Sequence, residues 1–421
     1  MSPALPALAL LLFLLGSGVL VGLSLIGGAA LPLAIWKDMS VAAFLAGDIW
    51  RSLTAPELAA LPLFVLMGEI LSRSRVPERL FDGLAVFVAP LPGGLLQCNI
   101  LGATLFAAIS GSSAATTATV GRITLPILAA RGHDRMLAIG SLTAAGALGF
   151  LIPPSIVLIL YGVLANVPIL SLFLAGLLPG LVLALLFGAL TGWLARRHET
   201  VVPAASSPGS FAAFRSLLPV LLLIAAVLGA LWSGLAGPTE SALIGVAGAL
   251  MLSAGEGARL SRLRAAFLAA SGTSAMLGLV LAGALFLSKA AAMFGIPEAA
   301  AEAVAHFALP APLLMLALLF CYVLLGMVLD GLSLMVATLP VALPMAKAAG
   351  YDPLWFGIYL VIAIEMAQIT PPVGFNLFIA RDLTGEPVGR IARATLPYFL
   401  AMLALALGLL AFPDLALFIP G

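Results

Sequence analysis

The sequence predicts an all-α polytopic membrane protein that contains two copies of one membrane unit. Of its 421 residues, 63% are hydrophobic and only 9% are charged, whereas a soluble domain carries about 25% charged residues. Landmarks of the first half, such as Leu125-Pro126 and Asp134, recur as Leu343-Pro344 and Asp352, always 218 positions later. Each half also carries one Pro-Pro pair within an apolar stretch.

Stretches of roughly 20 apolar residues are long enough to cross a bilayer as helices. The first stretch could be one kinked helix or two short ones, and Gly16 and Gly18 favour two that meet there. A polar stretch at 198–214, rich in Ser, Pro and Ala, is typical of a flexible linker between the repeats. The candidate spans are 5–35, 58–72, 170–195, 217–234, 239–254, 265–288 and 395–418.

Two apolar regions, 92–166 and 312–381, are interrupted by Gly, Ser, Thr and Pro. We interpret each region as a re-entrant hairpin followed by a helix that breaks at its Pro-Pro pair, because proline lacks the backbone N–H and clashes with the preceding turn. The residue before a proline is pushed towards extended backbone, so we expect Ile152 to leave the helix. Matched, broken segments of this kind are typical of the binding region of secondary transporters. The predicted hairpins are 94–130 and 313–346, and the breaks are Pro153-Pro154 and Pro371-Pro372.

The distribution of basic residues predicts the orientation. Most of the 19 Lys and Arg residues fall in loops that one topology places on the same side, whereas Lys37, Arg51, Lys289 and Lys347 fall on the other side. The positive-inside rule makes the arginine-rich side cytoplasmic. Both termini then lie outside, the first hairpin enters from the cytoplasm, and the second hairpin enters from outside. The two halves are therefore predicted to be inverted repeats.

The tip of the first hairpin is a run of small hydroxylated residues. Ser112 or Ser113 can cap the returning half-helix, and the free N–H groups of a helix N-terminus favour a carboxylate. Nearby hydroxyls and unwound carbonyls suit a hard cation such as Na⁺. Close helix packing through small residues is the alternative. The candidate binding residues of this half are Ser110, Gly111, Ser112, Ser113, Thr116, Gly149, Pro153, Pro154 and Ser155.

The second half presents a different set of polar residues. Asp330 is its most informative acid, because an ionisable residue in a membrane segment is costly and often functional; it could hold Na⁺ or cap a half-helix. Glu365 is a weaker candidate that could pair with Arg381 or with a neighbouring helix. The candidate binding residues of this half are Gly326, Asp330, Gly331, Ser333, Thr370, Pro371, Pro372, Gly374 and Asn376. Those expected to hold Na⁺, across both halves, are Ser112, Ser113, Gly149, Asp330 and Thr370.

Other classes of function fit the sequence poorly. The net charge of +1, without a basic stripe, argues against a nucleic-acid partner. The sequence has no phosphate-binding GxxxxGK[ST] loop, and an intramembrane protease would need a Ser–His pair or two aspartates at membrane depth. We therefore expect no enzymatic activity, and no cofactor beyond Na⁺ as a coupling ion.

Several motifs distributed over nearly the whole chain carry a family resemblance. They are 106–114 (FAAISGSSA), 149–155 (GFLIPPS), 161–162 (YG), 173–180 (FLAGLLPG), 237–240 (GPTE), Asp330 and 370–377 (TPPVGFNL). Together they resemble the large membrane subunit of tripartite ATP-independent periplasmic (TRAP) transporters, a branch of the ion transporter superfamily. One position departs from the family pattern: relatives commonly have glycine where this chain has Ala367, whereas Gly149 is kept in the first half. We expect the Ala367 methyl to crowd the second break.

The resemblance implies an elevator-type transporter of the bacterial inner membrane, with a fixed scaffold and a moving transport core. It implies Na⁺-coupled uptake of a small organic acid (a carboxylate) delivered by a periplasmic substrate-binding protein, and a small four-helix membrane subunit as a separate chain. A stand-alone Na⁺/dicarboxylate symporter of the same superfamily is the alternative. The expected parts are scaffold helices (1–91), a first transport core (92–166, with hairpin 94–130 and broken helix 136–166), a connecting helix (167–197), a cytoplasmic linker (198–214), further scaffold helices (215–311), a second core (312–382, with hairpin 313–346 and broken helix 354–381) and a C-terminal helix (383–421).

Overall fold

The computed structural model describes residues 4–37, 56–197, 210–254, 260–307 and 310–419, together with isolated positions between 41 and 54. Its regular elements over these residues are all helical, which confirms the all-α fold. The helices are α1 (Ala4–Gly16), α2 (Val21–Trp36), η1 (Pro56–Ala59), α4 (Ala60–Ser72), α5 (Val76–Val88), η2 (Gly94–Leu96), α6 (Gln97–Ser110), α7 (Ser113–Ala130), α8 (Arg135–Gly146), α9 (Leu148–Leu151), α10 (Ile156–Ala165), α11 (Ile169–Arg197), α12 (Ser210–Trp232), α13 (Pro238–Ala254), α14 (Leu260–Met293), α15 (Ile296–Phe307), α16 (Ala311–Gly326), α17 (Gly331–Ala348), α18 (Pro353–Gln368), α19 (Phe375–Thr384), α20 (Val388–Ala411) and α21 (Asp414–Leu417).

The outer surface of the helical assembly is apolar. Within the described residues, 6 helical segments are long and apolar enough to cross a membrane. Large apolar side chains point outward from several helices: Phe211 on α12 is 82% exposed, Leu185 on α11 is 73% exposed and Met251 on α13 is 75% exposed. Such side chains favour contact with lipid rather than water. The chain is a multi-pass membrane protein.

The internal repeat extends over the helices of both halves. The bounds of α7 and α17 differ by 218 positions at each end, and those of α2 and α13 or of α5 and α15 differ by nearly the same offset. Helix contacts also occur in exchanged pairs: α2 packs on α14 as α13 packs on α4, and α8 packs on α20 as α18 packs on α11. This exchange is what a pseudo-two-fold relation between the halves produces. Their opposite orientation in the bilayer stays a prediction.

The first stretch forms two helices, α1 and α2, as the sequence favours, with Gly18 in a left-handed conformation between them (φ 79°). Other boundaries differ from the sequence-based expectation. Neither α5 nor α15 was predicted, because each is short and carries charges such as Glu78 or Glu298. The predicted linker 198–214 extends too far, because residues 210–214 form the first turn of α12. Phe211 and its apolar neighbours belong to the apolar pattern of that helix. Residues 198–209 lie outside the described part.

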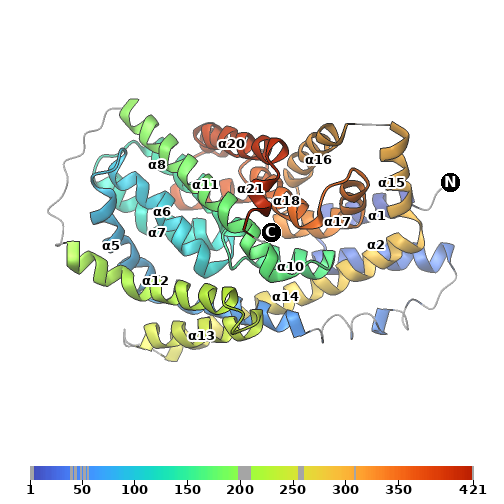
Figure 1. Ribbon diagram of the computed structural model, residues 1–421, viewed down its shortest axis with the longest axis horizontal. Helices are drawn as coiled ribbons and strands as arrows, with labels where there is room; N and C mark the ends of the chain where they lie inside the picture. The colour runs from blue at the N-terminus through green and yellow to red at the C-terminus, as the bar shows by residue number, and fades with distance from the viewer. Residues whose placement is uncertain are drawn as a thin grey trace.

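The two hairpins converge on one helix. In Figure 1, α12, α13 and α14 run along one edge of the molecule, while the hairpins α6–α7 and α16–α17 lie towards opposite sides of the view. Helix α18 packs against both helices of the second hairpin and against α9, which in turn packs against α6 and α7. The C-terminal end of α18 is therefore where the two repeats meet, and it positions the candidate site.

Candidate functional site

The tip of the first hairpin is a tight, hydrogen-bonded turn. Helix α6 ends at Ser110, and Gly111 reverses the chain in a left-handed conformation (φ 59°). Ser112 is extended, and its hydroxyl accepts a hydrogen bond from the Ala115 N–H (3.4 Å), so it caps α7 as the sequence predicts. The hydroxyls of Ser110 and Thr116 are 2.9 Å apart and close the turn from inside.

This tip packs directly on the first broken helix. The Gly111 carbonyl accepts a hydrogen bond from the Ile156 N–H (3.2 Å). A Cβ atom on Gly149 would lie 2.6 Å from the Ser112 carbonyl carbon and from the Ser113 Cα. Main-chain atoms at this distance cannot move aside as a flexible side chain does. Only glycine at position 149 therefore allows the tip to approach the broken helix.

The first break leaves main-chain groups without helical hydrogen bonds, although the whole segment is buried. Ile152 is extended (φ −82°, ψ 123°), which confirms that it leaves the helix. The Pro153-Pro154 peptide bond is cis. Ser155 restarts the chain as the cap of α10: its hydroxyl accepts from the Leu158 N–H (3.4 Å) and donates to the Phe150 carbonyl (2.5 Å). The break is thus held open by its own side chains.

The tip of the second hairpin is capped by a carboxylate. Asp330 accepts hydrogen bonds from the N–H groups of Leu332 (3.2 Å) and Ser333 (3.3 Å), and from the Ser333 hydroxyl. The capping role weighed from the sequence is therefore realised. Asp330 is nonetheless exposed, and its counterpart at the same offset in the first half is Ser112. The second tip adds a negative charge where the first has a neutral hydroxyl.

The second tip lies on the end of α18. A Cβ atom on Gly331 would lie 2.6 Å from Gln368 Nε2 and 3.0 Å from Phe150 Cε2. A Cβ atom on Gly326 would lie 2.3 Å from the Ala367 methyl. The Ala367 methyl lies against the space left by the missing side chain of Gly326, and its crowding of the second break stays a prediction.

The second break differs from the first in its exposure. The Pro371-Pro372 peptide bond is also cis, but both prolines are exposed. The Thr370 hydroxyl donates to the Met366 carbonyl (2.7 Å), and the Gly374 N–H donates to the Thr370 carbonyl (3.0 Å). Helix α19 then begins after Gly374 without a side-chain cap. Its first residue, Phe375, is exposed, whereas Gly374 and Asn376 on either side of it are buried.

A buried polar chain links the two repeats. The Ser113 hydroxyl donates to Glu365 Oε2 (3.1 Å), and Asn376 Nδ2 donates to the Ser113 hydroxyl (2.8 Å). Of the two pairings expected for Glu365, the one with a neighbouring helix is formed, through Ser113 of α7. The one with Arg381 is not formed; the Arg381 guanidinium lies 5.9 Å from the Phe378 ring centroid. One residue of the first tip thus holds groups from α18 and from α19.

The contacts divide the predicted binding residues into two groups. The first tip and first break form one group, joined by Asn376, while Gly326 and Gly331 contact α18. The residues expected to share Na⁺ divide in the same way. Ser112 and Ser113 lie against Gly149, whereas no described contact joins Asp330 or Thr370 to these three residues. From the sequence, Glu365 is only a weaker candidate, and Gln368 is not among the candidate binding residues. A carboxylate within the otherwise apolar α18 is the signal that points to this segment.

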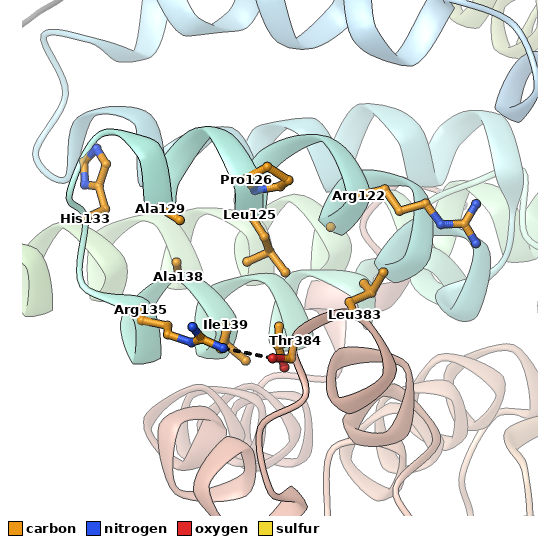
Figure 2. A pocket seen from close by; sticks show the side chains of 11 residues that line it. Arg122, Leu125, Pro126, Ala129, His133, Arg135, Ala138, Ile139, Leu383 and Thr384 are labelled. Atoms are coloured by element: carbon orange, nitrogen blue, oxygen red, sulfur yellow. Dashed lines mark hydrogen bonds between the residues drawn. The ribbon is translucent and has the colours of Figure 1, made fainter.

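A separate cavity of about 410 Å³ lies at the end of α7 opposite Ser113. Figure 2 shows His133 and Arg122 towards its two ends and Leu125 between them. Arg135 bounds it as well, donating to the Thr384 carbonyl (2.9 Å) and pairing with Glu386 (3.0 Å). None of the predicted binding residues lines this cavity, so it is separate from the candidate site.

Comparison with known proteins agrees with this architecture. Residues 8–415 match the family model described as tripartite ATP-independent periplasmic transporter, DctM component. The chain is 32% identical over 366 residues to the C4-dicarboxylate TRAP transporter large permease protein DctM of Pseudomonas aeruginosa, covering 86% of each protein. It is 29% identical over 415 residues to the sialic acid TRAP transporter large permease protein SiaM of Vibrio cholerae, covering 97% of this chain and 96% of that one.

Among solved structures, the fold is similar to the Alcanivorax borkumensis YdaH transporter, with a TM-score of 0.66 and 18% identity, covering 100% of this chain and 98% of that one. At this identity the likeness concerns the fold alone. The family match and the two permease relatives, by contrast, extend over most of the chain. The chain belongs to the TRAP transporter DctM family and is a large permease subunit.

Proposed function

We propose that this permease imports a small organic acid across the bacterial inner membrane, driven by Na⁺ and supplied by a periplasmic binding protein. The observation that carries the proposal is the meeting of two capped hairpin tips and two broken helices around α18. Such breaks present main-chain carbonyls and half-helix N-termini at membrane depth, which are the groups that secondary transporters use for cations and anions.

The uncapped start of α19 is the best-placed anion site. Its first N–H groups follow the exposed Pro371-Pro372 break, and Gly374 supplies no side-chain cap. A helix N-terminus carries partial positive charge and favours a carboxylate. The start of α7 is less suitable, because the Ser112 hydroxyl already accepts from one of its N–H groups, that of Ala115. The relatives named for C4-dicarboxylates and sialic acid support an organic acid as substrate.

Na⁺ entry is the proposed source of energy. One Na⁺ moving through a membrane potential of 100 mV releases about 2.3 kcal/mol. Two ions would support accumulation of roughly a thousandfold, since about 1.4 kcal/mol corresponds to a factor of ten. The hydroxyls and carbonyls at Ser112, Ser113, Gly149, Asp330 and Thr370 are the proposed ligands, because hard oxygen donors suit alkali cations.

The remaining parts of the proposal concern motion and partners. We place both hairpins and both broken helices in a moving core that carries the substrate past the scaffold helices. A small four-helix membrane subunit, supplied as a separate chain, would complete the scaffold. The tripartite composition that gives the family its name supports both partners.

The decisive experiment is reconstitution in proteoliposomes. The purified permease, its small membrane subunit and the binding protein of the same system are combined, and uptake of radioactive organic acids is followed with and without an inward Na⁺ gradient. We expect uptake only when all components and the gradient are present. Uptake by this chain alone would favour the stand-alone symporter, and uptake that is indifferent to Na⁺ would remove the coupling.

A further inference from the structure

We propose that Glu365, Gln368 and Asn376 form a monovalent-cation site that joins the two repeats. This inference rests on the proposed Na⁺ coupling, but it places an ion on side chains that are distinct from the hairpin caps. The site would lie beneath the first tip, between α18 and α19. Ser113, which contacts Glu365 and Asn376, would lie at the edge of the site.

Three oxygen atoms carry the inference. Within the described residues, Glu365 Oε1, Gln368 Oε1 and Asn376 Oδ1 are buried and have no hydrogen-bond partner. Their residues are 1%, 3% and 0% exposed, respectively. Leaving a buried acceptor without a hydrogen bond destabilises the folded protein, most of all when the group is charged. Three such acceptors in one neighbourhood indicate a bound electropositive ligand.

The three residues share one location. Glu365 and Gln368 are three positions apart on α18, so their side chains lie on the same face of the helix. Asn376 is tied to Glu365 through the Ser113 hydroxyl by bonds of 2.8 and 3.1 Å. Gly331 of the second tip contacts Gln368 from the other side. Both hairpin tips therefore touch residues of the proposed site.

The charge of Glu365 also requires a neutralising partner. No charged side chain of the described residues interacts with it; its polar partners are the Ser113 hydroxyl and the Phe150 main chain, both as hydrogen-bond donors. An ionised carboxylate without a counter-ion is very costly in such a place. If Glu365 were protonated instead, its O–H could donate to only one neighbouring oxygen. At most two of the three oxygen atoms would then be satisfied. One cation can bind all three, and it needs only hard oxygen ligands.

Equilibrium binding of radioactive Na⁺ to the purified permease in detergent tests the site without relying on transport. Glu365→Gln removes the charge and keeps the size, whereas Gln368→Leu removes only a neutral ligand. Glu69→Gln is the matched control, because Glu69 already pairs with Arg73 (2.8 Å) on α4. We expect Glu365→Gln to bind one Na⁺ fewer per chain, Gln368→Leu to bind it more than about tenfold more weakly, and Glu69→Gln to match the wild type.

Two results would overturn the site. The first is an unchanged Na⁺ stoichiometry and affinity in both Glu365→Gln and Gln368→Leu. The second is a Glu365→Gln variant in which only the pH dependence of uptake changes, which would assign a proton to Glu365 instead. If Glu365→Gln is unstable, Gln368→Leu decides alone. Wild-type uptake that is indifferent to Na⁺ is a different outcome, because it removes the proposed coupling itself.

Discussion

The two hairpin tips follow one building plan but lie in different surroundings. In each half a polar side chain caps the returning helix, a glycine allows close approach to a broken helix, and a Pro-Pro pair makes the break. Residues 151–160 of the first break are buried throughout, whereas Pro371 and Pro372 of the second break are exposed. The cap is the neutral Ser112 in the first half and the charged Asp330 in the second.

This difference indicates which side of the site is accessible. A carboxylate facing hydrocarbon is costly, so an exposed Asp330 at membrane depth needs a water-filled approach. Ser112 needs none, because a hydroxyl with a backbone partner can be buried. The second tip is therefore the one that we expect to face the organic solute. The predictions below test this contrast.

Replacing Asp330 should have the largest effect. We expect Asp330→Ala to abolish Na⁺-stimulated uptake while the protein still folds into the membrane, since losing a cap costs only about 1 kcal/mol. Asp330→Asn keeps the capping oxygen and removes the charge, so it separates the two roles. The matched Ser112→Ala variant keeps the Ser112 carbonyl as a Na⁺ ligand, so it should transport nearly as well as wild type. Full activity of Asp330→Asn would show that only the cap matters.

Adding a methyl group to the glycine at which each hairpin packs against its broken helix should distinguish the two halves. Gly149→Ala meets main-chain atoms of Ser112 and Ser113, whereas Gly326→Ala meets side-chain atoms, the Ala367 methyl most closely and Leu334 Cδ2 next. Overpacking of this kind costs about 1–3 kcal/mol. We expect both single variants to lower the thermal unfolding temperature, with Ala367→Gly restoring Gly326→Ala. A Gly326→Ala/Ala367→Gly protein as unstable as Gly326→Ala would contradict this packing.

The adjacent serines of the first tip should not be equivalent. Ser112→Ala removes one cap, whereas Ser113→Ala removes the hydroxyl between Glu365 and Asn376 and leaves buried polar groups unpaired. The expected cost is about 1 kcal/mol for Ser112→Ala and up to about 3 kcal/mol for Ser113→Ala. Thermal unfolding of the two variants under one condition measures the order, and equal losses would argue against the polar chain.

The smallest expected effect is on the pH dependence of stability, and it comes from loops at equivalent positions of the two repeats. His133 lies between α7 and α8, and burial together with the Arg131 charge lowers its pKa below the ordinary 6.5. The folded state then binds fewer protons than the unfolded state, so stability is complete above pH 6.5 and falls as the pH drops through and below that value. Its counterpart at the same offset, Tyr351, has a pKa that burial raises.

We therefore expect His133→Asn to lose less thermal stability than wild type on mild acidification, by a few tenths to about 1 kcal/mol. Unfolding temperatures at neutral and mildly acidic pH, measured in the same detergent, provide the comparison. Tyr351→Phe serves as the control and should leave the acid dependence unchanged. Identical acid dependence in His133→Asn and wild type would mean that His133 does not contribute.

Much of the architecture could be predicted because its causes are local. The Pro-Pro pairs, the extended Ile152 and the Ser112 cap follow from backbone chemistry that neighbouring residues determine. The short charged helices α5 and α15 were missed because hydropathy alone does not identify amphipathic segments. The contact of Ser113 with Glu365 could not be predicted from one sequence, since it joins residues of different halves and depends on how the two repeats pack.

The bridge from Ser113 to Glu365 and Asn376 has a consequence for the history of the chain. At the repeat offset, the counterparts of these three residues are Gly331, Ala147 and Leu158, which cannot form the same bonds. An ancestor assembled from two identical units would have held two such bridges or none. In one polypeptide each half can change independently, so the present molecule combines a duplicated framework with a bridge that only one half provides.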